Sequence, residues 1–392
     1  MHKGNLLKVA ASTAAAAMLF AACGGSSGSG GGSASTSSSG DGGGGKKSYN
    51  VAIVRWDAGD IFFNGVQAGE EKAIKDLEQK NGVKITTKVV AANDASGQLN
   101  GLRSLMAQGI DGVSLVPWRG ESMVNTLKQL HNQKIPVVVH NLTVPGAQYP
   151  FVAFDNQEAG KLAGTAMVDI IKKARGDAWA SKGGTIMLLR GDVTASFDKD
   201  RFAGYMSVLK PLADQNPNLK IVERANLDYE GEKARKAVDD QITRVGKDNM
   251  LAIGSVDGTM AVGGALPALK TSGAVTAANK PNRVAVTSID CSKAELDSIK
   301  AGALAHCSEQ PALAEGQLVQ NLLFDMMKNK TLTPSDAAQN VAGWDNAPWA
   351  PLQKTNRPDV GGAWYKTKTF GVPDQVPVDS PFHWANAGVS GG

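Results

Sequence analysis

The sequence predicts an α/β protein with two doubly wound, parallel-sheet domains. Short apolar runs rich in β-branched residues alternate with amphipathic helical stretches from residue 51 to residue 327. This alternation occurs in two series, which meet near residue 155. Polar and aromatic residues follow several strands directly, at the edge where open parallel sheets bind ligands. Two such domains with facing strand ends would enclose a ligand cleft.

The first series opens with residues 51–77, where a continuous apolar run precedes a polar and aromatic loop and then an amphipathic helix. The same pattern recurs along the chain. We expect strands at 51–54, 83–90, 112–116, 135–139 and 151–154, and helices at 66–77, 99–106 and 123–130.

The second series repeats this alternation. We expect helices at 159–171, 202–212, 230–245, 260–269, 294–299 and 313–327, and strands at 184–189, 219–225, 250–254, 284–289 and 303–307. Residues 332–392 differ, because tryptophans stand among many prolines and glycines with little periodicity. We predict no secondary structure for this segment, which could cover a hinge or the back of a domain.

Composition narrows the classes of partner. The chain has 392 residues, of which 42% are hydrophobic and 20% charged, as in a globular protein of about two domains. Its formal charge is +4, and removal of residues 1–22, which carry Lys3 and Lys8 and no acidic residue, lowers this to +2. Such a balance favours neither nucleic acid nor an anionic membrane surface as a partner.

The N-terminus has the features of an export signal. Lys3 and Lys8 precede a short apolar run, and small residues then lead to Cys23. This resembles a bacterial lipobox with Phe20 in place of the usual leucine, which implies a signal peptide at 1–22 and lipidation of Cys23. A signal peptide cut elsewhere is the alternative. Residues 23–48 are rich in glycine and serine and predict a flexible tether. We therefore expect an exported cell-envelope lipoprotein, periplasmic or on the outer face of the cytoplasmic membrane.

Two cysteines remain after Cys23. Cys291 and Cys307 could form a disulfide in an oxidising compartment, where closure of a loop of roughly 16 residues contributes about 3 kcal/mol. Two buried free thiols are the alternative. Neither cysteine belongs to a Cys/His pattern for zinc, and no metal or cofactor is expected.

Several short motifs together resemble the type I periplasmic binding proteins, specifically the ribose-like sugar-binding proteins of ABC importers. They lie at 60–63, 110–113, 135–138, 154–160, 200–205, 257–263 and 288–290. The resemblance implies a ligand cleft between the domains and a hinge of three crossings, near Asp155, near Gln310 and between Val341 and Gly343. It implies an N-terminal lobe at 49–154 plus 311–342, a C-terminal lobe at 155–310 and an extension at 343–392.

The resemblance also implies a set of ligand contacts. In the first domain these are Asp60, Phe62, Phe63 and Asn141, the last where the family usually has Asp. Leu142 stands where the family often has Arg. The contacts expected in the second domain are Lys199 at a ligand Arg, Asp257 at an Asn, Asp290 and Gln310. The departures at Leu142 and Lys199 weaken the case for ribose itself more than the case for a sugar.

The chemistry of these residues fits a polyol. Carboxylates and amides bind hydroxyl groups, and aromatic rings stack on the apolar face of a sugar. Trp56 and Trp118 lie near the same loop ends and join the candidate set, although they match no family position. Two structural roles stay open, because Asp60, Asp257 and Asp290 could cap helices and Phe62 or Phe63 could be core. We interpret His140 as a core or loop residue and assign Arg201 to structure, with Lys199 and Arg201 also able to pair with Asp198 and Asp200.

The expected function is capture of a monosaccharide or related polyol and its delivery to an ABC permease by a monomer without enzymatic activity. Neither domain carries a Gly-x-Ser-x-Gly elbow between a strand and a helix, a His-Glu-x-x-His motif or a P-loop. A carbohydrate-active enzyme using paired carboxylates and a ligand-sensing subunit of a membrane signalling receptor are the alternatives. A repressor would need an N-terminal helix-turn-helix, where this chain has its signal and tether.

Overall fold

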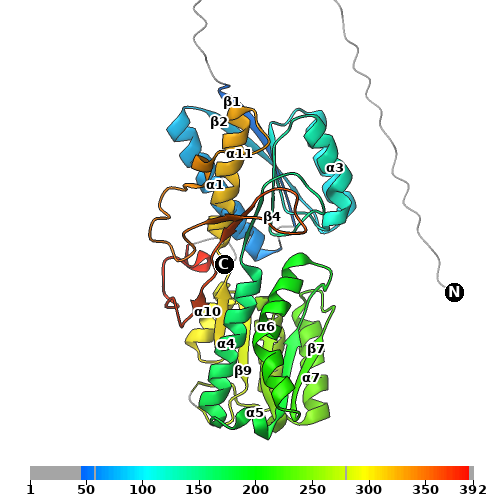
Figure 1. The fold of residues 1–392 in the computed structure, drawn as a ribbon, viewed down its shortest axis with the longest axis vertical. Helices are drawn as coiled ribbons and strands as arrows, with labels where there is room; N and C mark the ends of the chain where they lie inside the picture. The colour runs from blue at the N-terminus through cyan, green and yellow to red at the C-terminus, as the bar shows by residue number, and fades with distance from the viewer. Residues whose placement is uncertain (1–45, 57–58, 279, 388–392) are drawn as a thin grey trace, which may run out of the picture. The chain divides into compact units, whose positions relative to one another are not determined.

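The computed structural model describes residues 46–56, 59–278 and 280–387. The predicted signal peptide, the predicted lipidation of Cys23 and most of the expected tether lie outside these residues. Within the described part, helices flank two separate sheets, one built mainly from the first half of the chain and one from the second (Figure 1). The expectation of an α/β fold with two parallel-dominated sheets is confirmed.

The N-terminal lobe contains a seven-stranded sheet in the order β11-β12-β5-β4-β3-β1-β2, parallel except for the edge pair β11–β12. Its strands are β1 (Ser48–Arg55), β2 (Lys84–Ala91), β3 (Gly112–Leu115), β4 (Val137–His140), β5 (Phe151–Phe154), β11 (Gln353–Thr355) and β12 (Trp364–Thr367). Its helices are α1 (Ile61–Asn81), α2 (Ala95–Ala107), α3 (Gly120–Asn132) and α11 (Ala312–Asn329). Strands β3, β4 and β5 are buried along their whole length, as expected for a sheet covered on both faces.

The C-terminal lobe contains a six-stranded sheet in the order β13-β10-β9-β8-β6-β7, in which β13 alone pairs antiparallel. Its strands are β6 (Gly184–Leu189), β7 (Leu219–Arg224), β8 (Met250–Ser255), β9 (Ala285–Asp290), β10 (His306–Glu309) and β13 (Gly371–Val372). Its helices are α4 (Asn156–Arg175), α5 (Trp179–Lys182), α6 (Ser196–Gln215), α7 (Gly231–Val245), α8 (Gly258–Met260), α9 (Leu266–Thr271) and α10 (Lys293–Lys300). A π-helical turn at Ala261–Ala265 joins α8 to α9, within the single helix that we expected at 260–269.

The chain crosses between the sheets three times. Two crossings lie where we expected them, at Asp155 between β5 and α4 and at residues 310–311 between β10 and α11. The expected third crossing between Val341 and Gly343 is wrong, because the chain adds β11 and β12 to the first sheet before it crosses at 368–370 to β13. Residues 343–392, which we expected to form an extension, therefore contribute strands to both sheets. The error arose because β11 is short and fully exposed and so carries no apolar period.

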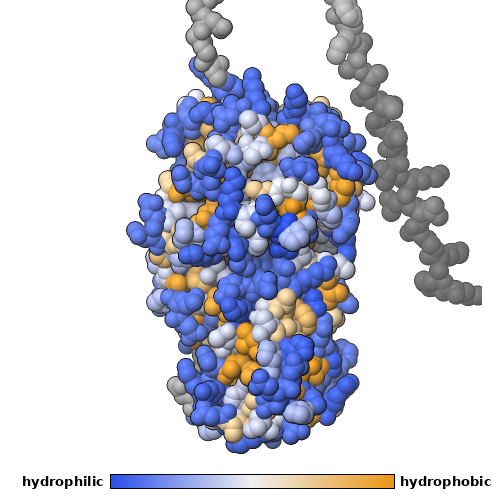
Figure 2. Space-filling model, in the orientation of Figure 1, coloured by the Kyte–Doolittle hydropathy of each residue, from blue (hydrophilic) through white to orange (hydrophobic). Residues whose placement is uncertain are grey.

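The described surface is polar over much of its area. The face shown in Figure 2 is largely hydrophilic, with apolar residues scattered in small groups. Among residues 46–56, 59–278 and 280–387, no helix combines the length and apolar character needed to cross a bilayer.

Candidate functional site

A cavity of about 1140 Å³ lies where the loops at the carboxyl ends of the strands in the two sheets face each other. The structure brings all ten predicted ligand residues to its wall: Trp56, Asp60, Phe62, Phe63, Trp118, Asn141, Lys199, Asp257, Asp290 and Gln310. They share this location because the carboxyl ends of parallel strands meet at one edge of each sheet. Their contact with a ligand stays a prediction.

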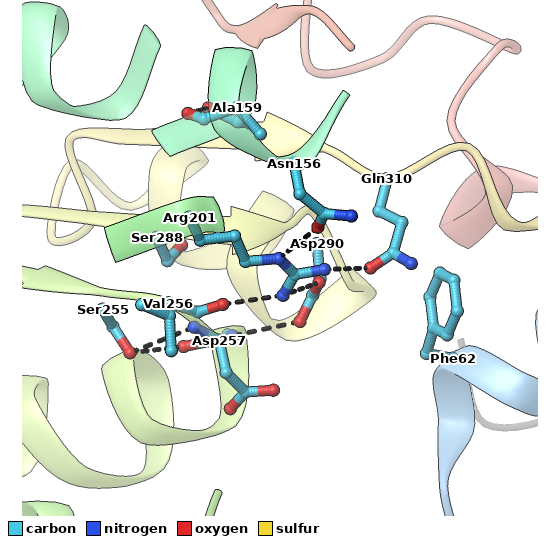
Figure 3. Close-up of polar contacts among 12 residues, drawn as sticks. Phe62, Asn156, Ala159, Arg201, Ser255, Val256, Asp257, Ser288, Asp290 and Gln310 are labelled. Carbon is cyan, nitrogen blue, oxygen red and sulfur yellow. Dashed lines mark hydrogen bonds and ion pairs between the residues drawn. The ribbon is translucent and has the colours of Figure 1, made fainter. Parts of the chain in front are cut away.

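Arg201 organises the wall contributed by the C-terminal lobe. Its side chain is almost fully buried, and Nε donates to Asn156 Oδ1 over 2.8 Å (Figure 3). Nη1 donates to the carbonyl oxygen of Val256 over 2.7 Å and to Asp290 Oδ1 over 3.1 Å, and Nη2 donates to Gln310 Oε1 over 2.6 Å. The planar guanidinium therefore holds Asp290 and Gln310 in fixed orientations at the cavity.

A close approach of two helices places this arginine. A Cβ at Gly160 of α4 would lie 1.9 Å from the carbonyl oxygen of Arg201 on α6, so only glycine allows α6 to come this near. Arg201, which we assigned to structure, holds Asp290 and Gln310 in place and also lines the cavity. The side chain of Lys199, which we expected at the ligand, is exposed at the rim.

The proposed pairing of Lys199 and Arg201 with Asp198 and Asp200 is wrong. Asp198 is buried and binds Arg190, whose Nε lies 2.7 Å from Asp198 Oδ1. Asp200 binds Arg357 from the loop between β11 and β12. The sequence offered nearby partners, but helical geometry turns Asp198 inward and Asp200 toward a distant part of the chain.

The opposite wall is aromatic. The ring of Trp56 lies 5.4 Å from that of Phe63 and 4.8 Å from that of Trp118, and Phe62 packs edge-on against Phe63 at 5.2 Å. Phe63 is 3% exposed and belongs to the core, whereas Phe62 is partly exposed, and the amide of Gln310 points toward its ring (Figure 3). Phe62 therefore offers the ring that a ligand can reach.

Asp60 and Asp257 both cap helices, while their contact with a ligand stays a prediction. Asp60 caps α1 by accepting the N–H groups of Phe62 and Phe63, and Asp257 caps α8 by accepting that of Met260. Both also line the cavity. Burial raises the pKa of Asp60 to about 6. Burial, with the neighbouring Asp290 carboxylate, raises the pKa of Asp257 well above its ordinary range.

Two further residues that line the cavity, Trp384 and Tyr229, were not among the predicted ligand contacts. Trp384, from the segment without periodicity, lines the cavity and donates its indole N–H to the carbonyl oxygen of Asp290 over 3.0 Å. Its ring lies 6.1 Å from that of Phe62. Tyr229 packs on Phe197, with ring centres 5.5 Å apart, in the loop that follows β7. The sequence feature that could have identified Tyr229 is its position in the loop after a predicted strand.

His140 is a core residue, as interpreted. It is 2% exposed, and its ring nitrogens lie 3.0 Å from Ser114 Oγ and 2.9 Å from Glu315 Oε1. Leu142 is also buried, in a hydrophobic cluster. Asn141 stands between them at the cavity wall with φ 65°.

Cys291 and Cys307 form a disulfide with a Cα–Cα distance of 5.4 Å. The bond ties the end of β9, directly after Asp290, to β10. Of the two alternatives that the sequence left open, the structure has the bonded form. The disulfide therefore braces the strand end that carries a cavity carboxylate.

Polar contacts link the lobes at the rim of the cavity. Arg119 lies 3.2 Å from Asp192 Oδ2, and the N–H of Thr143 donates to Ser196 Oγ over 3.3 Å. Arg357 Nη1 lies 2.5 Å from Asp200 Oδ2. These contacts would have to break for the lobes to separate.

Comparison with known proteins gives consistent results. A family model described as a periplasmic binding protein domain matches residues 51–331. The chain is 26% identical over 223 residues to the D-xylose-binding periplasmic protein of Escherichia coli, covering 56% of this chain and 62% of that protein, which is less than two thirds of its length. It is 26% identical over 295 residues to the ribose import binding protein of Bacillus subtilis, covering 75% of this chain and 86% of that one.

A solved structure supports the fold. The substrate-binding protein of a sugar ABC transport system from Bordetella parapertussis matches with a TM-score of 0.66 at 17% identity, over 87% of this chain and 94% of that one. At this identity the match shows a common fold.

Proposed function

This chain belongs to the periplasmic binding protein domain family, and from that premise we propose that it captures a monosaccharide or related polyol outside the cytoplasm and delivers it to an ABC permease. The observation that carries the proposal is the cavity between the lobes, where Asp290 and Gln310, both held by Arg201, face Phe62. A closed, ligand-bound state would dock on the permease.

The chemistry of the two walls supports a sugar. A hydroxyl group both donates and accepts, so carboxylate oxygens and an amide can bind it in a dry cleft. Gln310 is 2% exposed, and its Nε2 has no hydrogen-bond partner in the described residues, which leaves a donor for a ligand oxygen. Phe62 supplies the aromatic face on which the C–H side of a sugar ring stacks.

The names of the relatives point to the same class of ligand. One is named for xylose and the other for ribose import, and both are named as binding proteins. Because the chain is equally identical to proteins named for two different pentoses, the comparison supports a sugar as the ligand more than it supports xylose or ribose in particular.

A thermal-shift screen of pentoses, hexoses, inositols and sugar alcohols tests the proposal. A ligand that binds the native state raises the melting temperature. We expect at least one compound to raise it in proportion to concentration. If no compound in the panel raises it, the proposed function fails.

We further propose that the protein is anchored to the membrane through a lipid on Cys23, which lies outside the described residues. The support is the export signal and the glycine- and serine-rich tether that follows it. Labelling with a radioactive fatty acid in a bacterial host should mark the wild type and not Cys23→Ala. Label on both, or on neither, would argue against the anchor.

A further inference from the structure

We propose that the ligand of this cleft is a sugar or polyol that carries a positively charged amino group. The inference rests on the proposed function and names the class of compound within it. It comes from the balance of charge in the cavity wall.

Acidic side chains outnumber basic ones in this wall. Among the described residues that line the cavity, ten are acidic and four are basic. The acidic residues are Asp60, Glu121, Asp192, Asp200, Asp228, Glu230, Asp257, Asp290, Glu295 and Asp359, and the basic residues are Arg119, Lys199, Arg201 and Arg357. An enclosed cleft with one dominant sign of charge attracts ligands of the opposite sign.

Three of the four basic side chains lie at the rim. Arg119 pairs with Asp192, and Arg357 pairs with both Asp200 and Asp359. The side chain of Lys199 is exposed. These cations therefore balance rim carboxylates, and Lys233 pairs with Asp228 and Glu230. Burial raises the pKa of Glu295 to about 8, so this group is mostly neutral at pH 7. The deep carboxyl groups that remain are those of Asp60, Asp257 and Asp290.

Arg201 compensates a single deep carboxylate. Its ion pair is with Asp290, and its other hydrogen bonds go to the neutral oxygens of Asn156, Val256 and Gln310. Figure 3 shows the carboxyl group of Asp257 pointing away from this guanidinium. Among the described residues, neither Asp60 nor Asp257 forms a direct ion pair with a basic side chain. Arg55 lowers the pKa of Asp60 and Arg201 lowers that of Asp257 through space, but burial outweighs both effects.

The raised pKa values of these carboxyls agree with that deficit of positive charge. Burial raises the pKa of Asp60 to about 6, and burial and Asp290 raise that of Asp257 well above its ordinary range. A buried carboxylate without a partner cation is costly, so it takes up a proton unless another positive charge arrives.

The ligand is the best source of that charge. In the described part of the chain, no three Asp, Glu, His or Cys residues are placed together to hold a metal ion. An ammonium group donates three hydrogen bonds and suits carboxylate oxygens. The free Nε2 of Gln310 calls for an oxygen acceptor, so the same ligand also carries hydroxyl or ring oxygens.

Matched compounds of one skeleton test the proposal by calorimetric titration of the purified protein at pH 7. Glucosamine, glucose and glucuronate differ in charge, as do galactosamine, galactose and galacturonate, and amino, neutral and acidic pentoses, inositols and alditols complete the panel. An amine with a pKa of about 7.7–8.0 is mostly charged at pH 7. We expect an amino compound to bind at least about tenfold tighter than its neutral counterpart, and the acids not to bind.

The outcomes separate the two proposals. If a neutral compound binds as tightly as its amino counterpart or more tightly, the inference is overturned while the proposed function stands. If nothing in the panel binds, both fail. Affinity for the amino compound should also rise from pH 5 to pH 7 as the carboxyls ionise, whereas binding that needs a protonated carboxyl would weaken over the same range.

Asp257→Asn probes the charge directly. Asparagine also caps a helix, so α8 should keep its start while one carboxylate is lost. We expect the preference for the amino over the neutral compound to fall about tenfold. Glu232→Gln, which removes an exposed charge on α7 that does not line the cavity, should leave that preference unchanged. A preference that survives Asp257→Asn would contradict the assignment.

Discussion

Single side chains define the chemistry of the cleft, and Arg201 is the clearest case. Its guanidinium joins Asp290 from β9 and Gln310 from the hinge within one planar set of hydrogen bonds. Lys199, two residues earlier on the same helix, is turned to solvent because neighbouring helical positions face different directions. Helix orientation, more than residue type, therefore decides which of the two cations lies in the buried wall of the cavity.

Arg201→Lys should weaken ligand binding by about 2 kcal/mol or more, because an ammonium group cannot reproduce the forked contacts to Asp290 and Gln310. Calorimetry with the best ligand from the screen measures this. Lys199→Ala should weaken ligand binding less than Arg201→Lys does. If Lys199→Ala weakens binding more than Arg201→Lys does, the assignment of the two residues is wrong.

Glu295 should make the stability of the protein depend on pH. It is fully buried beside Ser288 and Ser292, and burial raises its pKa from 4.5 to about 8. The folded state then binds a proton more tightly than the unfolded state, so this contribution is present below about pH 4.5 and is lost as pH rises through 8.

Glu295→Gln removes this dependence and can still complete the capping box of α10. Denaturant titration measures the free energy of unfolding of both proteins at pH 5 and at pH 8. We expect this free energy to fall between the two pH values, and the fall to be smaller in the variant than in the wild type by more than about 1 kcal/mol. An equal fall in both proteins would contradict the raised pKa.

At the scale of elements, the segment after β13 completes the cleft. His383 and Glu309 are both fully buried, and His383 Nδ1 lies 3.0 Å from Glu309 Oε2. This pair fixes the segment against the hinge, where Trp384 contacts Phe62 of one lobe and the backbone of Asp290 in the other. A region without periodic pattern thus supports both walls.

Trp384→Ala should weaken ligand binding at least about tenfold, because Phe62 and Asp290 lose their common support. Trp344→Ala is the matched control. Trp344 is also buried but packs in the N-terminal lobe and bonds Gln317 over 3.0 Å. Each variant should lose about 3–5 kcal/mol of stability. Equal losses of affinity in both would mean that Trp384 acts only through global stability.

Over the whole described chain, the parallel architecture was predictable and so was most of the cleft. Apolar runs and helical periods mark the strands and helices, and strand ends of parallel sheets converge at one edge, which brought Asp60, Asn141, Asp257 and Asp290 together. The resemblance to a known family sharpened that choice.

Arg201, Trp384 and the third crossing were not predictable for physical reasons. Arg201 acts through the orientation of α6 on α4, which depends on the close approach at Gly160. Trp384 and strands β11 to β13 depend on pairing between residues far apart in sequence, and short strands at sheet edges carry little periodic pattern of their own.

The central claim is that one ligand lies between the lobes and contacts both. Calorimetric titration of the best ligand into Phe62→Ala, altered in the N-terminal lobe, and Asp290→Ala, altered in the C-terminal lobe, tests it most directly. We predict that each change weakens binding of that same ligand at least about tenfold, or 1.4 kcal/mol. If either variant binds it with wild-type affinity, the ligand does not bridge the two walls.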